Sequence, residues 1–177
     1  EKAMKLLREQ GVNHVAMLTG DNTRAAGTVA NKLGIDKFYA DLLPEDKVSI
    51  LEKLIRQRQD EGKIAFVGDG INDAPVLARA DVGVAMGALG SDAAVETADV
   101  VLMNDSPMKM TEAVSIAKQT RQIVWQNIIL AFVVKGIFIL FGAMGMATMW
   151  EAVFADMGTA LLAVANSTRI IGKNRLN

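Results

Sequence analysis

The chain has 177 residues, of which 51% are hydrophobic and 22% are charged, and its formal net charge is −1. This balance gives no reason to expect nucleic-acid binding, which needs a basic face. Because the sequence holds no Cys and one His, it excludes a disulfide framework, a thiolate metal site, a cysteine nucleophile and a histidine-rich zinc site within these residues.

From Glu1 to about Arg121, short apolar runs alternate with helical patterns. The expected elements are a strand at Val12–Leu18, a helix at Thr23–Leu33 that stops at Gly34, a short strand at Lys37–Ala40, a helix that begins at Pro44, a buried strand at Ile64–Val67, a short helix that ends at Ala80, a strand at Val82–Met86, a helix near Asp92–Ala98 and a strand at Val100–Met103. This alternation predicts an α/β fold, with a Rossmann-like parallel sheet covered by helices on both faces. Ligands of such sheets bind at the carboxyl ends of the strands.

Two polar loops follow predicted strands. Thr19–Asn22 reads T-G-D-N, and a hydroxyl with backbone N–H groups at a helix N-terminus suits a phosphate, although a plain capped helix explains the same residues. Gly68–Pro75 reads G-D-G-I-N-D-A-P. Its two carboxylates, Asp69 and Asp73, suit Mg²⁺, and the alternative is a turn followed by a helix cap. Lys47, one turn into a helix, suits neutralisation of a phosphate, or else is a solvated surface charge.

In this order, T-G-D-N, L-P-E-D-K and G-D-G-I-N-D-A-P resemble the phosphorylation domain of the P-type cation-transporting ATPases, in the haloacid dehalogenase superfamily. The resemblance covers essentially the whole chain, and it implies ATP as the energy source and an aspartyl-phosphate intermediate. It also implies a role for each loop residue: Asp69 binds Mg²⁺ with support from Asp73, Thr19 contacts the phosphoryl group in a loop formed with Gly20 and Asp21, Lys47 stabilises phosphoryl charge, and Asn72 fixes its loop.

One part of the family pattern does not occur in residues 1–177. The family's phosphorylated aspartate lies in D-K-T-G-T, and neither this string nor T-G-E is found here. We therefore expect this chain to be the C-terminal part of a larger enzyme and unable to form the aspartyl-phosphate alone. Its expected partners are the actuator, nucleotide-binding and other membrane segments of the same polypeptide, together with the lipid bilayer.

Two apolar stretches follow the predicted α/β domain. Ile128–Trp150 holds one charge, Lys135, and exceeds the roughly 20 residues that a membrane-spanning helix needs. The second stretch, from Ala152 to about Ile171, contains only Asp156 before Arg169. We expect a transmembrane helical hairpin with its turn near Gly145–Glu151. A buried core helix is the alternative for either stretch.

Basic residues flank the expected hairpin at both of its ends: Lys118 and Arg121 before it, and Arg169, Lys173 and Arg175 after it. By the positive-inside bias, both ends face the cytoplasm. We therefore expect a multi-pass integral protein of the plasma membrane, with residues 1–121 in the phosphorylation domain, 122–171 in the hairpin and 172–177 in a cytoplasmic tail. Pro107–Gln126 runs into the first apolar stretch without Gly or Pro after Pro107, which predicts one continuous helix.

An ionisable residue inside a bilayer indicates a functional site. Lys135 and Asp156 fall at comparable depth in the expected hairpin, so they can pair; snorkelling of Lys135 or an interfacial Asp156 is the alternative. Two helices after the phosphorylation domain resemble the heavy-metal class. Lys135 and Asp156-Met157-Gly158 look like the zinc/cadmium/lead exporters, which implies that Asp156 binds the transported Zn²⁺, Cd²⁺ or Pb²⁺ and that Lys135 is its counter-charge. A pump for copper or another cation, or a membrane-anchored phosphatase-like module, are the alternatives.

Overall fold

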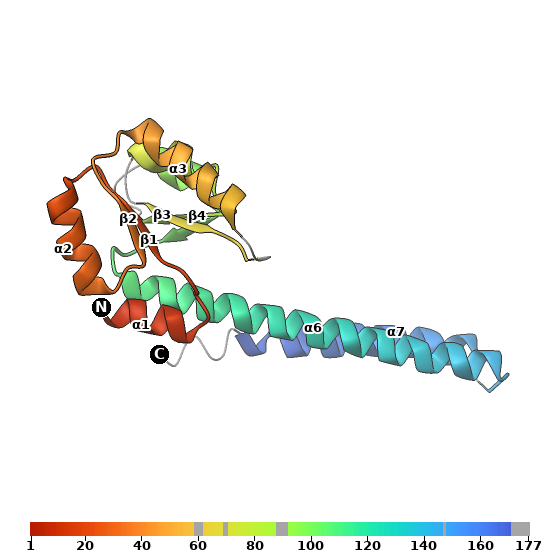
Figure 1. The fold of residues 1–177 in the computed structure, drawn as a ribbon. Coiled ribbons are helices and arrows are strands. Elements are labelled where there is room, and N and C mark those ends of the chain that lie inside the picture. The colour runs from red at the N-terminus through yellow and green to blue at the C-terminus, as the bar shows by residue number, and fades with distance from the viewer. Residues whose placement is uncertain (59–61, 69–70, 88–91, 147, 171–177) are drawn as a thin grey trace. The chain divides into compact units, whose positions relative to one another are not determined.

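The chain folds as two compact units, Glu1–Glu112 and Ala113–Asn177. The computed structural model describes residues 1–58, 62–68, 71–87, 92–146 and 148–170 (Figure 1). In the first unit the elements are α1 (Lys2–Glu9), β1 (Ala16–Leu18), α2 (Thr23–Leu33), β2 (Lys37–Tyr39), α3 (Pro44–Gln57), β3 (Ala65–Gly68), the 3₁₀ helix η1 (Ile71–Asp73), α4 (Ala74–Leu77), β4 (Val82–Met86), α5 (Asp92–Thr97) and β5 (Val100–Leu102). The predicted alternation of strands and helices is confirmed.

All strand pairs in the first unit are parallel, as predicted, but they form two sheets rather than one. β1 pairs with β2, with Leu18 opposite Tyr39. The other sheet has the order β3–β4–β5, with Val84 between Val67 and Val100. The predicted parallel-sheet α/β fold is confirmed, and among the described residues its hydrogen-bonded ladders join β1 to β2 and, separately, β3 to β4 to β5.

Three aspartates tie neighbouring strands together at their amino ends. Each directly precedes a strand and accepts a backbone N–H at the start of the neighbouring strand or one residue before it: Asp36 from Val15 at 2.7 Å, Asp81 from Ile64 at 2.9 Å, and Asp99 from Gly83 at 2.8 Å. These bonds satisfy backbone donors that the short ladders leave unpaired. We refer to the three contacts as the aspartate ties.

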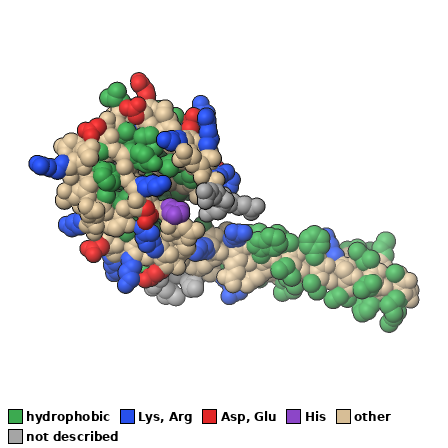
Figure 2. Space-filling model, viewed as in Figure 1, with side chains coloured by type: hydrophobic (Ala, Val, Ile, Leu, Met, Phe, Trp, Pro, Cys, Tyr) green, Lys and Arg blue, Asp and Glu red, His purple; other side chains and the backbone are tan. Residues whose placement is uncertain are grey.

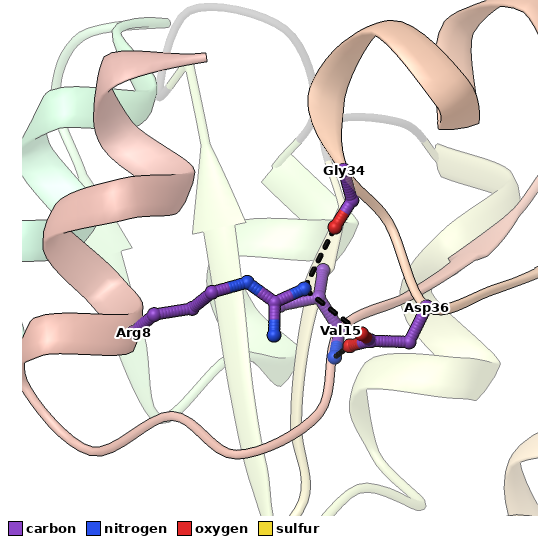
Figure 3. Close-up of polar contacts among 4 residues, drawn as sticks. All are labelled: Arg8, Val15, Gly34 and Asp36. Carbon is purple, nitrogen blue, oxygen red and sulfur yellow. Dashed lines mark hydrogen bonds and ion pairs between the residues drawn. The ribbon is translucent and has the colours of Figure 1, made fainter.

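The first tie also holds α1, a helix that the sequence patterns did not predict. Figure 3 shows the Arg8 guanidinium reaching from α1 to the Gly34 carbonyl and the Asp36 carboxylate, at 2.7 and 2.9 Å. The N–H of Val15 first, and the Arg8 guanidinium second, hold the pKa of the Asp36 carboxyl below its ordinary value of 3.8. The same carboxylate therefore joins α1, β1 and the segment after α2.

The core of the first unit lies where α3 and α4 cover the three-stranded sheet. Its fully buried large side chains are Leu51, Val76, Leu77 and Val84. The backbone of α4 approaches β4 so closely that a Cβ added to Gly83 would stand 2.6 Å from the Leu77 carbonyl oxygen. This contact fixes the helix that follows the G-D-G-I-N-D-A-P loop against the sheet.

The second unit is a helical hairpin of α6 (Pro107–Ala143) and α7 (Met149–Ser167). The continuous helix predicted through Pro107–Gln126 is confirmed. The turn was expected near Gly145–Glu151, and it lies there: α6 ends at Ala143, Gly145 turns the chain with φ +69°, and Thr148 caps α7 in a capping box with Glu151.

Apolar side chains dominate the surface of the hairpin. Figure 2 shows them along both helices, and they include the exposed Phe132, Ile139 and Phe154. Among the described residues, α6 is long and apolar enough to cross a membrane by its length and composition.

Candidate functional site

The T-G-D-N loop directly follows β1 and leads into α2. Asn22 is the N-cap of α2 and accepts the N–H of Ala25 at 2.9 Å, which fixes where the helix begins. The Thr19 hydroxyl donates to the Asp21 carboxylate at 3.0 Å and accepts the Asp21 N–H at 3.1 Å. Thr19, Gly20 and Asp21 thus form one closed turn at the carboxyl end of a strand.

The segment between β2 and α3 holds this turn from the other side. The Thr19 N–H bonds to the Tyr39 carbonyl at 2.9 Å, and the Leu42 N–H bonds to the Thr19 carbonyl at 3.2 Å. A Cβ added to Gly20 would lie 3.3 Å from the Leu42 carbonyl oxygen, so this glycine is closely approached. The next residue, Leu43, is the N-cap of α3, the helix that carries Lys47.

Lys47 and Asp73 form a part-buried ion pair. The Lys47 Nζ lies 2.7 Å from Asp73 Oδ1, and the side chains are 18% and 10% exposed. Asp73 ends the 3₁₀ helix after β3, so the pair joins α3 to the G-D-G-I-N-D-A-P loop. Opposite charges at this distance in a partly dry site attract more strongly than on an open surface. The structure therefore brings two of the predicted site residues into direct contact.

Of the other residues predicted for a site in the G-D-G-I-N-D-A-P loop, the structure describes Asn72 but not Asp69. Asp69, the expected first ligand of Mg²⁺, lies outside the described residues. Asn72 lies in η1 and is exposed. The described residues hold no group of three or more side chains that could bind a metal ion. A Cβ added to Gly68 would lie 2.9 Å from Asp73 Oδ2, so only glycine leaves the room beside that oxygen.

In the second unit, Lys135 and Asp156 lie on facing sides of α6 and α7. Lys135 Nζ is 3.1 Å from Asp156 Oδ1, and both side chains are exposed in this unit. The expected pairing of these two residues across the hairpin is present.

A network of amides that the sequence patterns did not single out ties the same two helices at the end away from the turn. Asn127 Nδ2 donates to the Ala163 carbonyl at 3.2 Å and to Ser167 Oγ at 3.1 Å. Asn166 Nδ2 donates to Asn127 Oδ1 at 2.9 Å and to Gln126 Oε1 at 3.2 Å. The available signal was amide side chains at the ends of both apolar runs, Gln126 and Asn127 in one and Asn166 in the other.

The comparisons with known proteins agree on one family. Residues 1–81 match the family model of the haloacid dehalogenase-like hydrolases. The chain is 59% identical over 169 residues to the zinc-transporting ATPase of Synechocystis sp., covering 96% of this chain and 23% of that protein. It is 58% identical over 170 residues to the cadmium, zinc and cobalt-transporting ATPase of Bacillus subtilis, covering 96% of this chain and 24% of that protein.

Among solved structures, the crystal structure of a zinc-transporting PIB-type ATPase in the E2·Pi state superposes with a TM-score of 0.86 at 43% identity, over 96% of this chain and 27% of that one. The chain thus spans about a quarter of the length of the curated relatives it matches. The likeness extends over residues of both units, since it covers 96% of this chain. Over 96% of its length the chain is therefore similar to about a quarter of ATPases that are named for the transport of zinc, or of cadmium, zinc and cobalt.

Proposed function

We propose that this chain supplies the phosphoryl-binding loops and part of the membrane metal site of an ATP-driven exporter of divalent heavy-metal cations. In that proposal, residues 1–121 belong to the phosphorylation domain, 122–171 form a transmembrane hairpin and 172–177 form a cytoplasmic tail. The observation that carries it is the ion pair of Lys135 and Asp156 across two apolar helices, in a chain that also holds the phosphorylation motifs.

The phosphoryl site combines the T-G-D-N loop with Lys47. Phosphoryl transfer depends on positioning and on neutralising charge, which a hydroxyl, backbone N–H groups and an ammonium supply. The Thr19 hydroxyl donates a hydrogen bond to the Asp21 carboxylate. It would bind a phosphoryl oxygen by donating to that oxygen in place of the carboxylate. A lysine ammonium has three N–H donors, and Asp73 uses one of those of Lys47. The remaining donors suit phosphoryl oxygens.

Mg²⁺ fits the second loop by its donor set. Asp73 is 7% exposed, and its Oδ2 faces Gly68, where no side chain stands. Mg²⁺ usually keeps several waters and binds one or two carboxylates together with substrate phosphates, so a cage of three protein ligands is not required. Asp69 and Asp73 would hold the ion, with Asn72 shaping the loop, and the bound ion would neutralise charge on the phosphoryl group.

The hairpin supplies the membrane part of the proposal. α6 is apolar enough to cross a bilayer, and α7 returns against it through the contacts of Asn127 and Asn166. Basic residues at both ends of the hairpin favour a cytoplasmic side for the phosphorylation domain and the C-terminus, by the positive-inside bias. We therefore assign the protein to a cell membrane as an integral, multi-pass protein.

Asp156 is the proposed ligand of the transported metal. A carboxylate inside a bilayer needs a counter-charge, and Lys135 supplies one at 3.1 Å when no metal is bound. A divalent cation would displace the ammonium from the carboxylate. The relatives named above transport zinc, or cadmium, zinc and cobalt, which supports a divalent cargo over copper.

The experiment is ATP hydrolysis by the full-length protein that contains this chain, in mixed detergent and lipid, with Zn²⁺, Cd²⁺, Pb²⁺, Co²⁺ or Cu⁺. We expect stimulation by the divalent ions in the unsubstituted protein and its loss in Asp156→Ala. Glu151→Gln is the matched control, because Glu151 is the other acidic residue of α7 and lies in its first turn. Stimulation by Cu⁺, or stimulation that survives in Asp156→Ala, would refute the assignment of the cargo site.

Residues 1–177 expressed alone should show no ATP hydrolysis above background, because the string D-K-T-G-T does not occur in them. Release of inorganic phosphate from ATP by the purified chain measures this directly. Sustained turnover would contradict the proposal that the phosphorylated aspartate lies in another segment, and would favour a phosphatase-like module.

A further inference from the structure

Among the described residues, Asp41 is the non-glycine residue with a left-handed backbone, at φ +56°. That region is disfavoured for L side chains, and aspartate and asparagine tolerate it better than most. Non-glycine residues held there cluster at functional sites, where the surrounding contacts maintain them. Asp41 lies between β2 and α3, outside every motif that the sequence patterns singled out.

The Asp41 carboxylate holds the beginning of α2. Its Oδ2 accepts the Thr23 hydroxyl at 2.7 Å and the Thr23 N–H at 3.2 Å. Thr23 is the first residue of α2, so this contact satisfies one of the N–H groups that a helix leaves open at its start. One side chain therefore joins the segment before α3 to the helix that follows the T-G-D-N loop.

Backbone N–H groups at Asp41 and Leu42 bind carbonyl groups of the T-G-D-N loop. The Asp41 N–H bonds to the Asp21 carbonyl at 2.8 Å, and the Leu42 N–H bonds to the Thr19 carbonyl at 3.2 Å. The left-handed turn at Asp41 is what presents these two successive N–H groups to one loop. Without it, the chain direction after Tyr39 would change and the two bonds could not form together.

These bonds decide which way the loop's own N–H groups point. The carbonyl of one residue and the N–H of the next belong to one planar unit, and in a trans peptide they point in opposite directions. The described peptide bonds are all trans. Because the carbonyls of Thr19 and Asp21 face Asp41 and Leu42, the N–H groups of Gly20 and Asn22 face the opposite side. Within the described part of the chain, no acceptor for either N–H is recorded.

We propose that Asp41 is a positioning residue that orients the Gly20 and Asn22 N–H groups of the T-G-D-N loop toward a phosphoryl group. This inference rests on the proposed function of the loop. Asp41 acts in two ways: its backbone conformation turns the carbonyls away, and its carboxylate fixes the first turn of α2. Glycine at this position would keep the left-handed backbone but lose the carboxylate. Asparagine would keep the backbone and a weaker, neutral acceptor, and alanine would favour neither.

The test uses inhibition of the full-length ATPase by orthovanadate, an analogue of the transferring phosphoryl group. Asp41→Ala should raise the half-inhibiting concentration about tenfold, which corresponds to about 1.4 kcal/mol. Asp41→Asn and Asp41→Gly should raise it by roughly threefold or less, because each keeps the left-handed turn. Glu45→Ala is the control, since Glu45 is an exposed acidic residue in the first turn of α3 and should leave inhibition unchanged.

Thr19→Ala separates this inference from the proposed function. If Thr19→Ala does not weaken inhibition, the loop is not the phosphoryl site and the proposed function fails at that point. If Thr19→Ala weakens inhibition and Asp41→Ala does not, only the role of Asp41 is overturned. The thermal unfolding temperature of each variant is measured alongside. An Asp41→Ala protein that unfolds earlier but binds orthovanadate normally would overturn the positioning role, as would an Asp41→Gly protein no better than Asp41→Ala.

Discussion

Removing Lys47 should destabilise the sheet that carries the G-D-G-I-N-D-A-P loop, and removing Asp73 as well should restore much of the loss. In Lys47→Met, the Asp73 carboxylate keeps its buried position without its partner at 2.7 Å. Breaking a fully buried ion pair costs about 3–5 kcal/mol, chiefly because the remaining charge is unpaired. The side chains here are 18% and 10% exposed, so water reduces the cost to roughly 2–3 kcal/mol.

Hydrogen exchange of the β3 and β4 amides measures this effect within the full-length protein, because exchange reports the local free energy of opening. A loss of roughly 2–3 kcal/mol makes exchange about 30- to 150-fold faster. In the double variant Lys47→Met with Asp73→Asn, we expect exchange within about tenfold of the unsubstituted protein, since a neutral amide is less costly to bury than an unpaired charge. Amides of α7 serve as the internal control.

The same variants separate stability from chemistry. The double variant should remain unable to turn over ATP, since Lys47 is also the proposed partner of the phosphoryl group. If the double variant exchanges as fast as Lys47→Met alone, the unpaired Asp73 charge is not the cause of the instability and the reasoning is wrong. If the double variant regains activity, Lys47 serves only to neutralise Asp73.

Three further predictions concern other contacts. The pKa values of Asp36 and Asp81 are lowered from 3.8, so their stabilisation is present at neutral pH and is lost as the pH falls below 3.8 through the folded values; acid unfolding should be less steep in Asp36→Asn and Asp81→Asn. Gly83→Ala should destabilise the first unit by about 2–3 kcal/mol, as overpacked substitutions do, whereas Gly158→Ala, with nothing within 4 Å, should not alter the hairpin's own unfolding. Asn127→Leu should raise the half-stimulating metal concentration about fivefold, because an interhelical hydrogen bond contributes about 1 kcal/mol; an unchanged value would contradict a role in aligning the two helices.

The sequence patterns predicted best the elements whose ends carry local signals. α2 has the predicted bounds because Asn22 caps its start and Gly34, with φ +67°, ends it. α3 begins at Pro44 as expected. β1 is shorter than predicted and begins at Ala16, because the N–H of Val15 bonds to the Asp36 side chain and not to a neighbouring strand. The alternation of apolar residues along a strand does not show that a side chain from elsewhere in the sequence will accept one of its N–H groups.

The misses are contacts between segments far apart in the sequence, or signals that were present but were not used. α1 is of the second kind: its apolar residues, including the buried Ala3 and Leu7, recur at helical spacing, although no side chain caps its start. The Thr148–Glu151 capping box, by contrast, is a local signal, and α7 begins directly after Thr148, within the predicted turn. The pairing of Lys47 with Asp73 depends on how α3 packs, and no local rule specifies it. The roles of the individual site residues stay predictions.

The aspartate ties have a consequence for how the first unit folds. Each tie joins residues only 21, 17 or 16 positions apart in the chain. Parallel strands are slow to pair because a crossover must close before any ladder bond forms. An aspartate that accepts an N–H at the amino end of the neighbouring strand closes the loop between the two strands before the ladder forms. The loss of chain entropy is modest because the closed segment is short. Asp36, Asp81 and Asp99 would then act in the folding transition state, and their replacement should slow refolding more than it speeds unfolding.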